Sequence, residues 1–118
     1  MKFELVGKLK GGKNAVQTTR SGRRYPNPAF VTWRNEMLRQ VADQLEPASL
    51  LVTPARLTVY YYHGDNLRRD VDNLLGGLFH LLERAGLVKD DTLIKEVHWE
   101  PMGLDRKNPR ATVILEAI

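Results

Sequence analysis

The strongest constraint on the fold of this chain is the apolar segment 71–85, which carries bulky apolar side chains on nearly every side. They are Val71, Leu74, Leu75, Leu78, Phe79, Leu81 and Leu82. A helix with this pattern belongs in the centre of a fold, and Gly86 supplies the left-handed residue that ends it. Gly76 and Gly77 within the helix each cost roughly 1 kcal/mol relative to alanine. We therefore expect another backbone to pack against them, either within the fold or across a dimer contact.

Shorter periodic segments flank this helix. Asn27 and Pro28 read as an N-cap and a first helical residue, and the helix they open stops before Pro47. Its apolar stripe, spaced by three and four residues, is Phe30, Trp33, Met37, Val41 and Leu45. Trp33 on this stripe is better read as a core anchor than as a base-stacking residue. Alternating apolar and polar residues predict strands at 2–6, 56–63, 95–101 and 110–118, with a short extended piece at 50–53.

These elements predict a small α+β domain, in which a three- or four-stranded mixed sheet packs with two helices. The 118 residues fit one compact domain spanning 1–118. The chain has no cysteine, which excludes disulfides and thiolate zinc sites. No uncharged stretch is long enough to cross a membrane or to act as a secretory signal, so we expect a soluble, cytoplasmic protein.

Two acidic pairs bracket the central helix: Asp70 and Asp72 before it, and Asp90 and Asp91 after it. If residues 70–72 are extended, the first two carboxylates project to the same face and can bind one ion. The turn after the helix would then bring three or four carboxylates into reach of each other. Carboxylate oxygens are ligands that Mg²⁺ prefers. The alternative is that Asp70 and Asp72 are solvated acids at a helix start.

Basic residues are concentrated at the other end of the sequence. Residues 1–40 carry nine Lys or Arg against two acidic residues, whereas residues 41–118 carry nine against twelve. Segment 7–27 has no persistent periodicity, and we interpret it as a mobile loop or ribbon that binds nucleic acid. The candidate DNA contacts in it are Lys8, Lys10, Lys13, Arg20, Arg23 and Arg24. The alternative is a solvated basic loop with no such role.

The run from Arg69 to Ile94 resembles the RusA-type Holliday junction resolvases. The shared pattern is an Asp-Val-Asp-Asn-Leu motif at 70–74, an apolar helix, and Ala-Gly-Leu-Val-Lys-Asp-Asp-Thr-Leu-Ile at 85–94. The resemblance extends over the length and element order of the chain, and it is weak before Asn27 and after Pro101. It implies a homodimer whose substrate is a four-way DNA junction, with two sites that nick opposed strands during recombination and repair.

The reaction expected from these residues is phosphodiester hydrolysis with one or two Mg²⁺ ions per site, Mn²⁺ being a possible substitute. The expected ligands are Asp70, Asp72 and Asp91, with Asp90 helping. Arg69 would neutralise charge that develops on the phosphate. Further residues with expected roles are Arg68 and Lys89, which would bind DNA, and Asn73, which would support the acidic ligands.

One position departs from the family pattern, which usually has a lysine one helical turn after the second acid. This chain has Gly76 there, and Lys89 is a candidate for an equivalent charge. A second hypothesis is therefore a junction-binding module with lost or weak cleavage. A purely structural protein would leave both acidic pairs without a purpose.

Overall fold

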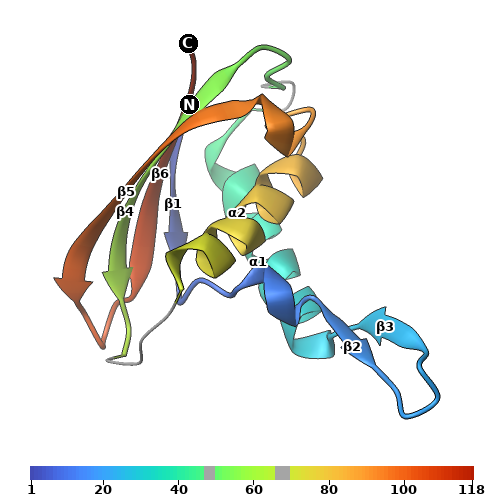
Figure 1. Cartoon of the computed structure of the whole chain (residues 1–118). Helices are drawn as coiled ribbons and strands as arrows, with labels where there is room; N and C mark the ends of the chain where they lie inside the picture. Colours follow the sequence, from blue (N-terminus) through green and yellow to red (C-terminus); the bar gives the residue numbers. More distant parts are fainter. Residues whose placement is uncertain (47–49, 66–69) are drawn as a thin grey trace.

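The computed structural model describes residues 1–46, 50–65 and 70–118. Two helices cover one face of a four-stranded sheet, and a two-stranded hairpin stands away from this body (Figure 1). The elements in chain order are β1 (Lys2–Val6), the 3-10 helix η1 (Gly12–Asn14), β2 (Val16–Thr18), β3 (Arg24–Pro26), α1 (Pro28–Gln44), β4 (Ala55–His63), α2 (Val71–Arg84), the 3-10 helix η2 (Asp91–Leu93), β5 (Ile94–Leu104) and β6 (Arg110–Ala117).

The sheet has the strand order β1-β6-β4-β5, in which β4 and β5 are parallel and the other pairs are antiparallel. Parallel neighbours need a crossover connection, and α2 provides it by passing over the sheet between β4 and β5. Alternate residues of the strands face the helices and are fully buried, among them Leu5, Leu57, Val59, Val113 and Leu115. The predicted mixed sheet with two helices is therefore confirmed.

Helix α1 begins as the sequence predicts. The Asn27 side-chain oxygen accepts a hydrogen bond from the Ala29 backbone N–H at 2.9 Å, and Pro28 is the first helical residue. The predicted stripe is buried at Phe30, Trp33, Met37 and Val41. Trp33 is 8% exposed, and its indole N–H donates to the Lys8 carbonyl at 2.9 Å. Trp33 is thus a core anchor, which also holds the start of the basic segment against the body.

Side chains of α1 close the β1 edge of the sheet. The Gln44 amide accepts from the Glu4 N–H at 2.7 Å and donates to the Glu4 carbonyl at 2.6 Å. Gln40 makes the same pair of hydrogen bonds to Val6, at 2.7 and 3.0 Å. The two amides satisfy edge groups that otherwise invite another strand to pair, so β1 is blunted as an edge.

The basic segment 7–27 has two structurally different parts. Its first part packs against the body, with Leu9 only 5% exposed and Gly11 buried. Its second part is the β2–β3 hairpin, whose residues are exposed and which projects away from the helices (Figure 1). Residues 16–26 form a two-stranded ribbon, and both the mobility of the segment and its binding of nucleic acid stay predictions. In the described part of the chain, neither helix is long and apolar enough to cross a membrane.

Candidate active site

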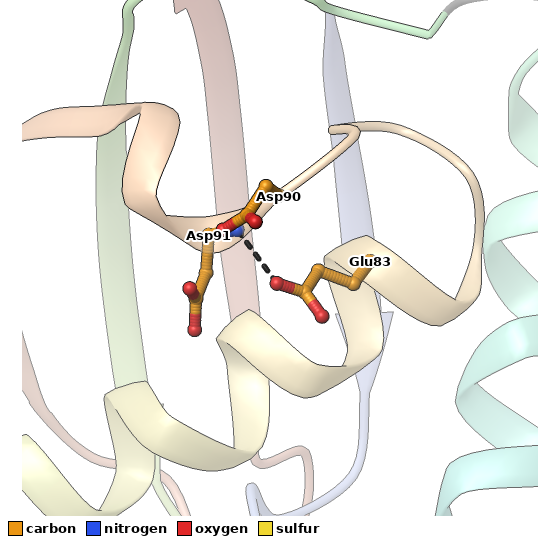
Figure 2. Close-up of side chains that lie close together, drawn as sticks. All are labelled: Glu83, Asp90 and Asp91. Atoms are coloured by element: carbon orange, nitrogen blue, oxygen red, sulfur yellow. Dashed lines mark hydrogen bonds between the residues drawn. The ribbon is translucent and has the colours of Figure 1, made fainter.

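Three carboxylates gather at the C-terminal end of α2: those of Glu83, Asp90 and Asp91, each with an oxygen within 4.8 Å of the others (Figure 2). Glu83 lies in the last turn of α2, and Gly86, two residues beyond the end of this helix, has the predicted left-handed conformation with φ of 73°. The chain then turns back, so that Asp90 caps η2 and Asp91 is its first residue. We call this group the C-terminal acidic cluster.

Hydrogen bonds fix the two aspartates of this cluster. Glu83 Oε1 accepts a hydrogen bond from the Asp91 backbone N–H at 2.6 Å (Figure 2). Asp90 Oδ1 accepts from the Thr92 backbone N–H at 2.8 Å. The Thr92 N–H also lowers the pKa of Asp90. Partial burial raises the pKa of Asp91, and the negative charges of Glu83 and Asp90 raise it further. Negative charge therefore accumulates at Asp91, where a cation would relieve it.

The other acidic pair lies at the N-terminal end of α2. Asp70 is the N-cap residue, with φ of −72° and ψ of 122°, and its side chain makes no capping hydrogen bond. Asp72 is already in the first helical turn, and both residues are exposed. The prediction that residues 70–72 are extended together is wrong, because the helix begins at Val71. The alternative interpretation, in which Asp70 and Asp72 are acids at the start of a helix, agrees with their observed positions.

One chain does not bring the two acidic pairs together. Asp72 and Glu83 are eleven residues apart on the same helix, which corresponds to about 16 Å along its axis at roughly 1.5 Å per residue. A single Mg²⁺ ion binds its oxygens at about 2.0–2.1 Å. The expectation that the helix and turn make the acids of one chain converge is therefore wrong. The roles of Asp70, Asp72, Asp90 and Asp91 as metal ligands stay a prediction.

The N-terminal half of α2 is instead covered by residues 10–13, which we call the glycine strap. A Cβ atom at Gly77 would overlap the Lys10 carbonyl oxygen, and one at Gly12 would lie 3.0 Å from the Gly76 carbonyl carbon. The predicted close approach of a backbone to the glycine pair is confirmed. It comes from the same chain, so the version in which Gly77 meets a second subunit is wrong.

Asn73 joins the glycine strap to the helix. Its side-chain oxygen accepts a hydrogen bond from the Lys13 backbone N–H at 2.9 Å. A Cβ atom at Gly11 would overlap the Asn73 carboxamide, so glycine is needed there for the close fit. The sequence pattern predicts that Asn73 supports the acidic ligands. In the structure its contact is with the strap, one residue away from Asp72.

The predicted DNA-binding cations that the structure describes are spread over four places. Lys8 forms an ion pair with Asp65 at 3.1 Å. Lys10 and Lys13 are exposed on the strap, and the hairpin and its turn expose Arg20, Arg23 and Arg24. Lys89 is exposed beside Asp90. Arg68 and Arg69 lie outside the described residues.

Glu83 is a cluster member that the sequence patterns did not single out. The available signal was its place in the last helical turn before Gly86, because the following turn must return past that end of the helix. An acidic side chain at that point lies beside the acids that follow the turn. The length of α2 gave a separate signal about the two acidic pairs. Its 14 residues hold the two ends too far apart for the acids of one chain to share a site.

Comparison with known proteins gave two matches. The family model described as endodeoxyribonuclease RusA matches residues 7–116, a range that includes the basic segment, both acidic pairs and α2. The curated protein named crossover junction endodeoxyribonuclease RusA from Aquifex aeolicus (strain VF5) is 25% identical over 79 residues. That alignment covers 67% of this chain and 62% of the Aquifex protein.

Proposed function

Because this chain belongs to the endodeoxyribonuclease RusA family, we propose that it is a metal-dependent endodeoxyribonuclease that resolves four-way DNA junctions. The observation that carries the proposal is that the family match contains both acidic pairs, and that carboxylates cluster at one of them. The name of the Aquifex relative supports junction DNA as the substrate. The exposed basic hairpin supports binding to a polyanion.

The C-terminal acidic cluster fits a divalent metal ion. Its three carboxylates offer only hard oxygen ligands, which is the donor chemistry that Mg²⁺ and Mn²⁺ favour. The raised pKa of Asp91 indicates that negative charge there is not balanced within the cluster. A bound Mg²⁺ would supply an activated water and would stabilise charge on the phosphate and the leaving oxygen.

The protein side chains supply the remaining functions. Asp90 and Asp91 would hold the ion, and Lys89 beside them would attract the phosphate backbone. Arg69 would bind the phosphate as it gains charge. The hairpin arginines would contact the phosphates of a junction arm, which fixes position without reading sequence.

A homodimer reconciles the predicted ligands with the observed geometry. Asp70 and Asp72 lie at one end of α2 and Asp91 at the other. A two-fold axis that placed two α2 helices antiparallel would bring the N-terminal acids of one protomer to the C-terminal acidic cluster of its partner. Such a dimer has two equal sites, as paired nicks in a nearly two-fold substrate require.

The proposed activity is tested with purified protein and a synthetic four-way junction labelled on each strand. We expect Mg²⁺-dependent nicks at symmetry-related positions on two opposed strands, with linear duplex of the same sequence as the control. Loss of cutting on addition of EDTA and recovery with Mn²⁺ would identify the metal requirement. Equal cutting of the duplex would contradict junction specificity.

The second candidate is a junction-binding module without efficient cleavage. It is favoured by Gly76, which leaves no side-chain cation where a lysine is usual in the family. The same experiment separates the two functions, because a binding module would shift the junction in a gel and leave all four strands intact with Mg²⁺.

Mixing two inactive variants tests the shared site. In a dimer of one Asp70→Asn protomer and one Asp91→Asn protomer, a composite arrangement leaves one site with both acids intact. We therefore expect the mixture to nick one strand per junction, although each variant alone is inactive. If each site came from one chain, every site in the mixture would lack an acid and no cutting would return.

A further inference from the structure

The glycine strap packs against α2 so closely that side chains would not fit at several positions of the contact. Three glycines make it possible: Gly77 admits the Lys10 carbonyl, Gly12 lies on the Gly76 backbone, and Gly11 lies on the Asn73 carboxamide. Any side chain at Gly11, Gly12 or Gly77 would force the strap or its partner to shift, since the Cβ distances are 3.0 Å or less. The position of the strap is therefore fixed by close contacts of its own backbone with the α2 backbone and with the Asn73 side chain.

What the strap presents at this position is a cation. Lys13 is anchored through its own N–H on Asn73 at 2.9 Å, and Asn73 directly follows Asp72 in the first turn of α2. The Lys13 side chain is exposed. Among residues 1–46, 50–65 and 70–118, no carboxylate pairs with its ammonium, whereas Lys8 on the same segment is paired with Asp65.

An ammonium whose backbone is bound at the start of the helix that carries Asp70 and Asp72 has a clear chemical use. Asp70 and Asp72 repel a DNA phosphate unless positive charge is supplied close by. An ammonium on a four-carbon stem is a compact charge that suits a single phosphate oxygen. Fixing the backbone beneath it reduces the entropic cost of binding the phosphate.

We propose that the glycine strap is a built-in phosphate-binding element of the acidic N-terminal end of α2. Lys13 binds the DNA phosphate that approaches Asp70 and Asp72, and Asn73 is the positioning residue that holds Lys13 there. This inference rests on the proposed action on DNA. It gives Asn73 the role of positioning Lys13 for phosphate binding. It also explains the pairs Gly11-Gly12 and Gly76-Gly77, since both belong to the contact between the strap and α2.

The test is a double-mutant cycle on Lys13→Ala and Asn73→Ala, measured as affinity for a four-way junction without divalent metal over a series of salt concentrations. One phosphate contact contributes about 0.9 to the slope of log K against log salt. We expect each single variant to lower the slope by about this amount and the double variant to lower it no further. Metal-free binding keeps any effect on metal ligation out of the result.

Three further variants make the cycle specific. Gly11→Ala changes no charge but displaces Asn73, so we expect it to reproduce the slope of Lys13→Ala. Gly76→Ala adds a methyl group at the same interface with only a 4.0 Å contact to Gly12, and the slope should stay at the wild-type value. Lys8→Ala removes an equal charge from the same segment, and its effect should add to that of Asn73→Ala.

The outcomes separate this inference from the proposed function. Additive effects of Lys13→Ala and Asn73→Ala, or an unchanged slope in Lys13→Ala, would overturn the role of the strap. Since Lys13→Ala alters only an exposed side chain, that arm does not depend on a marginally folded variant. If wild-type protein bound junctions with the predicted coupling but never cut them with Mg²⁺, the nuclease proposal would fail and the strap would stand.

Discussion

Each end of α2 has two of the predicted aspartate ligands, but the charged groups around the two pairs differ. At the C-terminal end, Glu83 adds a third carboxylate to Asp90 and Asp91, and their mutual repulsion contributes to the raised pKa of Asp91. At the N-terminal end, Asp70 and Asp72 stand at a helix start beside a cationic strap. Under our proposal, the C-terminal acidic cluster attracts a metal ion, and the N-terminal end contributes two further carboxylates and a phosphate-binding cation.

This difference is the basis for our proposal that a single chain holds only part of the nuclease site. The proposed hydrolysis needs all of the predicted metal ligands within one site, but α2 holds Asp72 and Glu83 about 16 Å apart along its axis. Antiparallel pairing of two such helices places the unlike ends side by side. The comparison therefore predicts that changes at the two ends disable the same reaction while affecting binding and stability differently.

The largest expected effect is loss of cleavage when an acid is neutralised at either end. Asp70→Asn, Asp72→Asn and Asp91→Asn should each lower the single-turnover rate by more than about 100-fold. This is more than the usual effect of losing a residue that only supports a metal ligand. Junction binding without metal should persist or tighten, because repulsion of the phosphate is removed. Asp90→Asn should have a smaller effect. Wild-type turnover in any of the first three variants would remove that residue from the site.

The second prediction concerns the stability of the N-terminal end. Gly77→Leu should destabilise the fold by at least about 1–3 kcal/mol, the usual cost of overpacking, because the Lys10 carbonyl occupies the space. The neighbouring Gly76→Ala should stabilise α2 by up to about 1 kcal/mol. Urea unfolding of the two variants measures both changes. A stable Gly77→Leu variant would show that the strap leaves the helix readily.

Much of the fold was predictable because its signals are local. The spacing of Phe30, Trp33, Met37 and Val41 defines α1, and Asn27 marks where it begins. The order of strands in the sheet has no such signal, since the pairing of β1 with β6 joins opposite ends of the chain. The capping of that edge by Gln40 and Gln44 depends on the same long-range arrangement.

The site was predictable in its residues more than in its geometry. The acidic pairs were found by their chemistry, but the idea that they converge neglected the length of the helix between them. Gly11-Gly12 and Gly76-Gly77 were visible as two unusual pairs. Their contact was not predictable, because either pair had many other backbones available, and only the folded chain places one on the other.

The third prediction tests the exposed hairpin, whose proposed interactions with DNA involve neither end of α2. Each phosphate that an arginine neutralises contributes about 0.9 to the salt slope of junction binding. Replacing Arg20, Arg23 and Arg24 together with alanine should therefore lower that slope by up to about 2.7. The single-turnover rate at saturating protein should stay near the wild-type value, because the hairpin stands away from α2 (Figure 1). An unchanged slope would show that the hairpin is merely solvated.

The smallest expected effect concerns the stability of the metal-free protein, measured as Tm. Neutralising Asp72 and neutralising Asp91 should change it in opposite directions. The pKa of Asp91 is raised by burial and by its acidic neighbours, so protonated Asp91 favours the folded state. That contribution is complete below about pH 4, the ordinary range of aspartate, and is lost as pH rises through the raised pKa. Asp91→Asn keeps the side chain neutral and should raise Tm at neutral pH.

Asp72 lies in the first turn of α2, where negative charge interacts favourably with the helix dipole by about 0.3–1 kcal/mol. Asp72→Asn should therefore lower Tm at neutral pH, while Asp91→Asn should raise it. The rise in Tm corresponds to less than about 1 kcal/mol of unfolding free energy, because the cluster is exposed and screened. Thermal unfolding in low salt at about pH 3 and about pH 7 measures both. At the lower pH the contribution of protonated Asp91 is restored, so the effect of Asp91→Asn should shrink. Shifts of the same sign at neutral pH would show that the two ends of α2 are electrostatically alike, and the contrast between the acidic cluster and the helix start would fail.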